Sequence, residues 1–527
     1  MIKGPYYKYI PETIISVAFI VLASILNMQF LEGSNIDTII AGHDEYIAVK
    51  EVYSILHPLS FKHFFLAIIA GDVIYYGRLM FYVDALFAYI PFRIWGVEGM
   101  VYTVRMVHSL FLLASLLLLS RTFLKDTLQR ILFLFGSLAL YYSLYFIMMP
   151  KPEPMQLFFL ALFLYYFKKS DWSFGKHFIW LGIAFGLKFN VLLLLPALFA
   201  APFYSRQAGN LVFSREKILK GLKSFGLFLV GLFIAIPCLL LSPIRPVYIK
   251  NYVHETFGGT EKSYDDLSLT ISDWIEKGLG GSYLGHWLLG YFFMAFALVV
   301  FLYGIYNMIR KKNSVYLLVL SIGLILTWAI MIKTKRLWPH YIWTGYIFML
   351  LGLLLFASSR ASTAAKNYLN GGIAVFLLVS TFFFFNRELP LYTSLEKRKD
   401  VQETSIESRL AINYIRQHYP GAWVSTDGSV LFPFDDFLKA KPYHPFASEL
   451  PKTKETVFWW NGDHHERMWD PPADIVVFDR WYPPDEQASA KNTGGAQLAE
   501  LYQKHIGTDF VSDTSFGKVR IFKRKGL

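Results

Sequence analysis

The side chains most able to do chemistry in this sequence are cations placed where the chain is otherwise apolar. The segment KTKRLWPH holds Lys333, Lys335 and Arg336 directly before an apolar run, with His340 close behind them. Phosphate suits such a group, because arginine offers it a planar fork of donors and lysine a compact charge. His340 can bind phosphate or a hydroxyl, although a lone histidine often has only a structural role. We therefore expect an anion site beside this apolar run.

Two further cations occupy unusual places. Lys188 lies within LGIAFGLKFNVLLLLP, and a lysine at the centre of a membrane costs about 2.5 to 3.5 kcal/mol unless it reaches the interface, pairs or meets an anion. Of these, we expect an anion. Lys151 and Glu153 lie in MMPKPEP, a rigid corner because prolines end helices and fix the backbone. This corner is consistent both with a structural ion pair and with a contact to substrate.

Two adjacent carboxylates, Asp44 and Glu45, open the segment DEYIAVKEVY shortly after the first long apolar run. Acids in this position commonly just face water, so a solvated loop is the plain interpretation of the pair taken alone. The acids can take part in chemistry only if the intervening elements bring them and the cations to one side of a membrane. That depends on how often the chain crosses.

The composition is that of a membrane protein. Of 527 residues, 54% are hydrophobic and 17% are charged, and the mean hydropathy is +0.38. Apolar runs near the length of about 20 residues that crosses a bilayer recur over the first three quarters of the chain. They lie at 11–31, 99–120, 131–149, 154–167, 177–205, 224–242, 286–309, 314–332, 338–357 and 369–386. The sequence therefore predicts a polytopic α-helical membrane protein.

The net charge of +12 does not indicate a nucleic-acid partner, because the basic residues form short clusters between apolar runs. Membrane lipids with anionic headgroups and lipid phosphates are the expected partners. Cys238 has no second cysteine with which to form an intrachain disulfide. The first run is long and lacks a convincing small-residue cleavage site, which favours an uncleaved anchor over a signal peptide.

The run 177–205 is too long for one untilted span, and Gly186, Lys188 and Asn190 interrupt it. Broken membrane helices are tolerated where they line a cavity. If this run crosses and returns, and the N-terminus is cytoplasmic, nearly every short basic loop falls on the cytoplasmic side. A single crossing would place the basic clusters after residue 205 outside. We therefore predict about eleven transmembrane helices.

The same assignment places the candidate residues on the extracytoplasmic face. That face receives the loops 32–98 and 243–285, the KPEP corner, the GLKFN break and the KTKR segment. Three cations in a short outer loop violate the charge rule, and a functional anion explains the violation. Within the first loop, aromatic and aliphatic residues mix with Arg78 and Asp84 as in helices that lie in the interface. A pair of additional short spans within 64–95 is the alternative.

From Arg387 onward the apolar runs stop. SIESRLAINYIRQHYPG predicts an amphipathic helix ended by Pro420 and Gly421, and AWVSTD, ADIVVFD and GKVRIFKRK predict strands. We therefore expect a small α/β domain on the outer face, over 387–527, that recognises the acceptor, caps the site or supports the membrane part.

Other enzyme signatures are missing or weak. The sequence holds no P-loop, no HExxH and no nucleophile elbow. GDHHER at 462–467 offers two histidines and two acids, but adjacent histidines point apart and the flanks FWWN and MWDPP are typical of a loop. Because a metal site needs convergent ligands, we expect no zinc there.

Taken in order, these features resemble the GT-C superfamily of integral-membrane glycosyltransferases. The resemblance covers roughly residues 10–386 and is strongest to the branch of protein O-mannosyltransferases and lipid A aminoarabinose transferases. It rests on Asp44-Glu45-Tyr46, LMFYVDALFAYIPFRIWG, the span with Arg105, the KPEP corner, the G-x-K break before LLLLP, and KRLWPHY. The family's proline-rich approach to the aromatic segment is replaced by GDVIYYGRLMFYV, which leaves the acceptor open.

The resemblance implies that a sugar passes from a polyprenyl-phosphate donor to an acceptor with inversion and without a glycosyl-enzyme intermediate. Asp44 maps onto the family's acid and would be the general base for the acceptor hydroxyl. Glu45 would orient the acceptor or raise the affinity of Asp44 for protons. The lipid phosphate would be held by Lys335, Arg336 and His340, with Lys188 and Lys151 as further cations.

Glu153, Arg78 and Tyr46 complete the expected substrate-binding set. No cofactor is expected, although an acid pair leaves open the divalent metal that some relatives in the wider superfamily use. The resemblance thus implies a GT-C-like transmembrane catalytic domain over 1–386. The low cysteine content and the Lys-, Ile- and Phe-rich composition are compatible with a bacterial inner membrane. The alternatives are a transporter or flippase for lipid-linked sugars, which the missing inverted repeat disfavours, and an oligosaccharide-transferring enzyme or polymerase. The sugar, the acceptor, the carrier length and the oligomeric state stay open.

Overall fold

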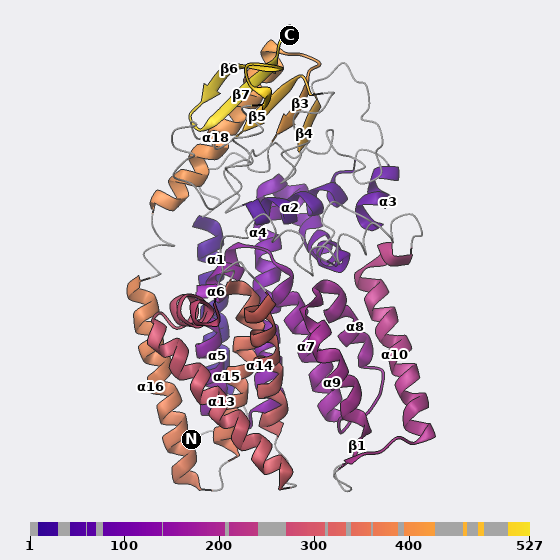
Figure 1. Ribbon diagram of the computed structural model, residues 1–527, viewed down its shortest axis with the longest axis vertical. Helices are drawn as coiled ribbons and strands as arrows, with labels where there is room; N and C mark the ends of the chain where they lie inside the picture. The colour runs from indigo at the N-terminus through magenta and orange to yellow at the C-terminus, as the bar shows by residue number, and fades with distance from the viewer. Residues whose placement is uncertain are drawn as a thin grey trace.

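The computed structural model describes residues 9–29, 43–58, 61–69, 77–139, 141–205, 210–240, 270–310, 315–333, 339–359, 362–387, 395–426, 457–460, 473–478 and 504–527. All ten apolar runs predicted from the sequence contain helix. The helices of the bundle are α1 (Ile10–Gln29), α4 (Arg78–Phe123), α5 (Thr127–Leu138), α6 (Tyr141–Met148), α7 (Pro152–Lys169), α8 (Phe178–Leu187), α9 (Leu195–Ala200), α10 (Arg215–Ala235), α13 (Trp287–Ile309), α14 (Val315–Lys333), α15 (Trp343–Ser358) and α16 (Thr363–Arg387) (Figure 1).

Seven of the helices in the described ranges are long and apolar enough to cross a membrane, namely α1, α4, α10 and α13 to α16. Shorter apolar helices accompany them at Thr127–Leu138, Phe178–Leu187 and Phe189–Phe203. The chain is therefore an integral membrane protein with a polytopic α-helical fold, as the hydropathy pattern predicts.

The run 177–205 breaks where the sequence predicts. Helix α8 ends at Leu187, Lys188 has extended backbone (φ −157°, ψ 132°), and a 3-10 helix, η3 (Phe189–Leu194), starts the return. The return continues through α9 and η4 (Ala201–Phe203) to a two-residue strand, β1 (Tyr204–Ser205), which pairs with β2 (Asn210–Leu211).

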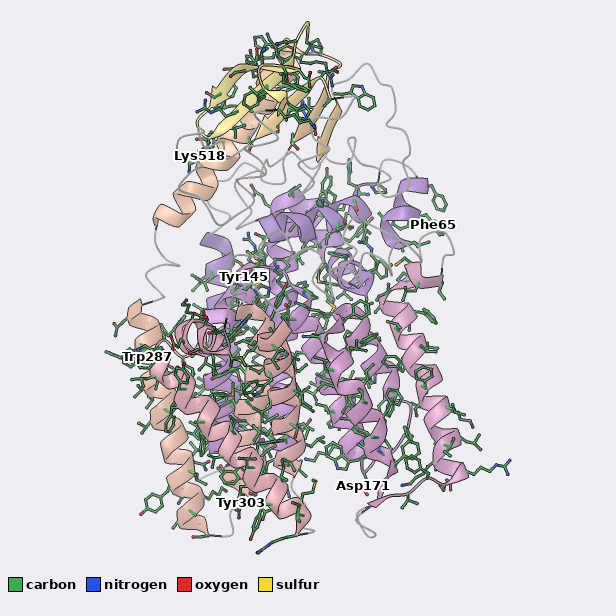
Figure 2. All side chains as sticks on the ribbon, viewed as in Figure 1. Phe65, Tyr145, Asp171, Trp287, Tyr303 and Lys518 are labelled. Carbon is green, nitrogen blue, oxygen red and sulfur yellow. The ribbon has the colours of Figure 1, made fainter. Side chains whose placement is uncertain are left out.

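Aromatic contacts join the two ends of this run. The rings of Phe178 and Phe199 lie 4.9 Å apart between centroids, and those of Phe174 and Phe203 lie 5.1 Å apart. β1 in Figure 1 and Asp171 in Figure 2 accordingly lie at the same lower end of the bundle. The run thus goes across and returns, as the positions of the basic loops predict.

Glycines let α8 and α10 pack closely. A Cβ atom on Gly182 would lie 2.0 Å from the carbonyl oxygen of Phe228, and one on Gly231 would lie 2.1 Å from that of Ile179. Both obstacles are backbone atoms, which cannot move aside as a flexible side chain would. Small residues commonly permit such close approach between membrane helices.

Gly231→Val should therefore destabilise the protein by about 1 to 3 kcal/mol or more, because overpacking forces the two helices apart. The thermal midpoint of the purified protein in detergent measures this. Gly226→Val in the same helix is the matched control, since a Cβ there meets nothing within 4 Å. Equal midpoints for the two variants would contradict the close packing of α8 on α10.

Helix α4 folds back on itself at Gly96, whose backbone is left-handed in φ (φ 65°, ψ −147°). Asp84 and His108 are 24 residues apart, yet Asp84 Oδ2 lies 3.0 Å from His108 Nε2. In a straight helix that separation would span about 36 Å. The bend is tight, because a Cβ on Gly99 would lie 2.6 Å from the carbonyl oxygen of Pro91.

The first half of α4 is amphipathic. Asp84, Ala85 and Ala88 are buried against the bundle, whereas Leu86 and Ile90 are 75% and 66% exposed. Helices α2 (His43–Leu56) and α3 (Phe61–Ile69) lie with it at the upper end of the bundle (Figure 1). The opposite face thus exposes large apolar side chains, which fits the interfacial placement that the sequence predicts.

A small domain lies beyond this same end (Figure 1). It contains α18 (Leu395–His418) and a sheet of β3 (Trp423–Thr426), β4 (Val457–Trp460), β5 (Ile475–Phe478), β6 (Phe510–Phe516) and β7 (Val519–Arg524). The strand order is β4-β3-β5-β7-β6, with β3 parallel to β4 and β5, and β7 antiparallel to β5 and β6. Ala411, Ile412 and Ile415 of α18 pack on one face of this sheet. The predicted α/β architecture is confirmed.

Two strands of this sheet were not predicted. FWWN, predicted as a loop, lies mostly in β4, an edge strand whose four residues show no alternation of polar and apolar side chains. Strand β6 is the other edge, and most of its side chains are partly or fully exposed. An edge strand of either kind leaves little trace in a hydropathy pattern. GDHHER lies outside the described residues.

Candidate functional site

Four of the predicted substrate-binding residues come together at one end of the bundle. Lys188 Nζ donates a hydrogen bond to Glu153 Oε1 and lies 4.4 Å from the centroid of the Tyr341 ring. His340 is within electrostatic reach of the ammonium groups of Lys151 and Lys188. The sequence separates these residues by up to 189 positions, so their convergence is a property of the fold and not of a local motif.

The cluster lies at the upper end of the bundle, where α2 and the first half of α4 are found. His340 stacks on Tyr145 at 5.8 Å between ring centroids, and Tyr145 is labelled at that end in Figure 2. His340 and Tyr341 belong to η8 (Pro339–Ile342), a 3-10 turn that leads into α15. The Tyr341 ring thus lies against the Lys188 ammonium, and a cation over such a ring is attracted to its face.

Helix ends position the charged members. Lys151 caps α7, and Pro152 occupies the first turn of that helix, where its missing N–H costs nothing. Glu153 follows in the same turn, where a carboxylate complements the helix dipole. Lys188 stands in the break between α8 and η3. Its side chain is 17% exposed, whereas that of Glu153 is 1% exposed, so the lysine is the more accessible partner.

The structure corrects the expected role of Glu45. Its side chain is fully buried, and both of its oxygens accept hydrogen bonds from Arg105, from Nε at 2.5 Å and from Nη2 at 2.9 Å. A carboxylate enclosed in this way cannot orient an acceptor, and the guanidinium compensates the negative charge that was expected to act on Asp44. Glu45 instead anchors the start of α2 to α4.

The structure also corrects the expected role of Arg78, which was assigned to substrate. Its side chain is 2% exposed, and its Nη1 lies 2.6 Å from Glu51 Oε2. Its Nη2 donates to the carbonyl oxygen of Ala67, and its Nε donates to that of Ile68 at 3.4 Å. Each nitrogen of the guanidinium therefore faces protein, and Arg78 joins α2, α3 and α4.

The remaining predicted site residues are described only in part or not at all. Asp44 and Tyr46 belong to α2, but the description does not extend to their side chains. Lys335 and Arg336 lie outside the described residues. Within the ranges that the structure covers, no group of three histidine, cysteine, aspartate or glutamate side chains could hold a metal ion.

Several polar residues at the site carried no prediction of a role. Arg105 and His108 lie one turn apart on α4, and His108 Nδ1 is 2.8 Å from the carbonyl oxygen of Lys151. Arg105 contacts Glu45 of α2, and His108 contacts Lys151 of the KPEP corner. One turn of α4 therefore holds α2 next to that corner. The signal in the sequence was the presence of an arginine and a histidine inside the apolar run 99–120.

No family model matches the chain, and no curated protein matches it. Solved structures do. The crystal structure of ArnT from Cupriavidus metallidurans bound to undecaprenyl phosphate matches 96% of this chain and 97% of that one, at 12% identity and a TM-score of 0.50. The apo structure of the same protein matches the same shares at 11% identity and a TM-score of 0.46. At this identity the likeness is one of fold alone, and it extends over nearly the whole chain.

Proposed function

We propose that this chain is an inverting glycosyltransferase that moves a sugar from a polyprenyl-phosphate donor to an acceptor at the extracytoplasmic membrane face. One observation carries the proposal: Lys151, Lys188 and His340 converge at the end of the bundle where the acid-bearing helix α2 lies. The likeness in fold to a structure that holds undecaprenyl phosphate supports a lipid phosphate as the anion.

The net charge of the cluster suits a lipid phosphate once Lys335 and Arg336 of the KTKR segment are included. Lys151 and Lys188 with Glu153 amount to two cations and one carboxylate, or a net charge of +1. A departing lipid phosphate carries more negative charge than this, and preorganised cations are what stabilise charge that develops in a transition state. Lys335 and Arg336, which precede His340 by five and four residues in the sequence, are the further cations that the proposal assigns to the phosphate.

In the proposed mechanism, Asp44 removes the proton of the acceptor hydroxyl as that oxygen attacks the anomeric carbon. The bond to the lipid phosphate breaks on the opposite face of the sugar, which gives inversion. The cations and His340 bind the phosphate as its charge grows. The acids and cations must lie at a membrane boundary, because the donor is buried in lipid and the acceptor reaches the site from water.

The same proposal fixes the orientation and the domains. The N-terminus lies in the cytoplasm of a bacterial cell, and the sheet domain lies outside the inner membrane, because this places most short basic loops inside. Residues 1–386 form the catalytic membrane domain and residues 387–527 the outer domain. The outer domain lies at the end where the cluster is found, so it can recognise the acceptor or cover the site.

The direct test incubates the purified protein with a panel of polyprenyl-phosphate sugars and follows release of the lipid phosphate. Release that depends on an acceptor supports transfer. A protein that binds these lipids and never releases the phosphate would be the transporter or flippase instead. The mass of the product separates addition of one sugar from transfer of a whole oligosaccharide.

Lys188→Met should raise the KM for the donor about 10-fold, because a hydrogen bond to a charged group is worth about 1.5 to 3 kcal/mol. Lys220→Met is the matched control, since Lys220 also pairs with a glutamate, Glu216, but both side chains are well exposed. The KM for each donor of the panel measures the effect. An unchanged KM in the Lys188 variant would remove this lysine from the donor site.

A further inference from the structure

Two buried side chains hold the backbones of the two candidate lysines. His108 Nδ1 lies 2.8 Å from the carbonyl oxygen of Lys151. Gln156 Nε2 donates to the carbonyl oxygen of Lys188, and to that of Ala184 at 3.0 Å. Both His108 and Gln156 are 0% exposed. Lys151 is the N-cap of α7, where the backbone N–H groups lack helical acceptors, and Lys188 is the C-cap of α8, where the carbonyl oxygens lack helical donors.

The partners of His108 determine where its protons lie. A carbonyl oxygen can only accept, so Nδ1 carries a proton and donates it to Lys151. The other nitrogen, Nε2, is 3.0 Å from Asp84 Oδ2, and both side chains are fully buried. One further proton therefore lies between the imidazole and the carboxyl group. Asp84 thus fixes the ring in the orientation and protonation that hold Lys151.

We propose that Asp84, His108 and Gln156 are positioning residues of the donor site, which act on the lipid phosphate through Lys151 and Lys188. This inference rests on the proposed function, because it takes the phosphate of the donor as the anion. Asp84 reaches His108 only because α4 folds back at Gly96. The contact chain from Asp84 through His108 to Lys151 therefore depends on this bend. Side chains that bind a ligand tightly need supporting contacts that limit their motion.

The buried polar residues could instead serve stability alone, and the two roles predict different results. Asp84→Asn keeps the network, because the amide can donate to Nε2 of a neutral ring that still donates from Nδ1. Asp84→Ala removes the partner of Nε2. A positioning role requires that the asparagine variant keep the affinity for the lipid phosphate and that the alanine variant lose it.

The experiment measures the Kd of undecaprenyl phosphate for the full-length protein in detergent, together with its thermal midpoint. Buried groups that orient the ligands of a metal are worth about 10- to 100-fold in affinity, and we expect about 10-fold here. Asp84→Ala, His108→Phe and Gln156→Met should each weaken binding to this extent. Asp84→Asn should stay within about 2-fold of the wild type, since its amide keeps a donor toward Nε2 of His108.

Gln129→Met is the matched control. Gln129 is also 0% exposed and donates to a backbone carbonyl oxygen, that of Leu354, at 3.1 Å, but it contacts Asn370 of α16 and none of the cluster. This variant should lower the thermal midpoint as much as Gln156→Met and leave the Kd unchanged. In Asp84→Ala and His108→Phe, the KM for the donor should rise while the KM for the acceptor stays constant.

The inference is wrong if Asp84→Ala or His108→Phe folds and binds the lipid phosphate normally, or if Asp84→Asn is as impaired as Asp84→Ala. If both Asp84 variants fail to fold, His108→Phe and Gln156→Met decide by their Kd compared with that of Gln129→Met. A wild type that binds undecaprenyl phosphate and transfers no sugar defeats the proposed function but leaves the positioning role in force. A wild type that does not bind the lipid defeats both.

Discussion

Asp44→Asn should lower kcat for sugar transfer by about 10²- to 10⁴-fold, the usual contribution of a general base. The amide cannot accept a proton from the acceptor hydroxyl. Glu45 cannot take over, because its carboxylate is fully buried and both of its oxygens are bound to Arg105. Donor binding should not change, since the cations lie on other elements than α2.

Release of the lipid phosphate measures kcat, and titration with undecaprenyl phosphate measures binding. Glu216→Gln is the matched control: it exchanges an exposed carboxylate at the first turn of α10 for an amide and should leave both quantities unchanged. Full activity in Asp44→Asn would remove Asp44 from the mechanism. Loss of donor binding in that variant would assign the aspartate to the binding site and not to proton transfer.

The parts of the fold that were predictable are those that depend on local sequence. A run of apolar residues identifies a span wherever it lies. A lysine followed two positions later by an asparagine costs so much free energy inside a membrane that it predicts a break in such a run. Lys188 is indeed at the break, and its partner Glu153 belongs to the corner that was predicted from prolines. Local signals of this kind do not depend on how distant elements pack.

The errors concern residues whose partners are distant in the chain. Arg78 was assigned to substrate, but its partner Glu51 is 27 residues away on another helix. The boundary at residue 98 that the sequence predicts, between interfacial helices and the span 99–120, lies close to the fold-back of α4 at Gly96. The fold-back itself was not predicted, because a glycine reveals a left-handed backbone only once its conformation is known. Asp84 and His108 could not be paired before that bend was known.

Breaking the Glu45–Arg105 pair should have the largest effect on stability. Both side chains are 0% exposed, and Arg105→Met leaves a carboxylate buried without its counter-charge. Loss of one partner of a buried ion pair costs about 3 to 5 kcal/mol. We expect a strongly reduced yield and thermal midpoint in detergent for Arg105→Met. Lys220→Met, which breaks an exposed pair, should leave both unchanged.

The double variant Glu45→Leu/Arg105→Met separates stability from function. Apolar residues of similar volume often replace a buried pair without loss of stability, so the thermal midpoint should recover to near that of the wild type. Activity should not recover, because Asp44 directly precedes Glu45 in α2. Its position depends on the ion pair that holds the start of this helix against α4. A double variant that is both stable and fully active would show that the ion pair has no part in positioning Asp44. One that is stable and inactive, with donor binding intact, would tie the general base to Arg105.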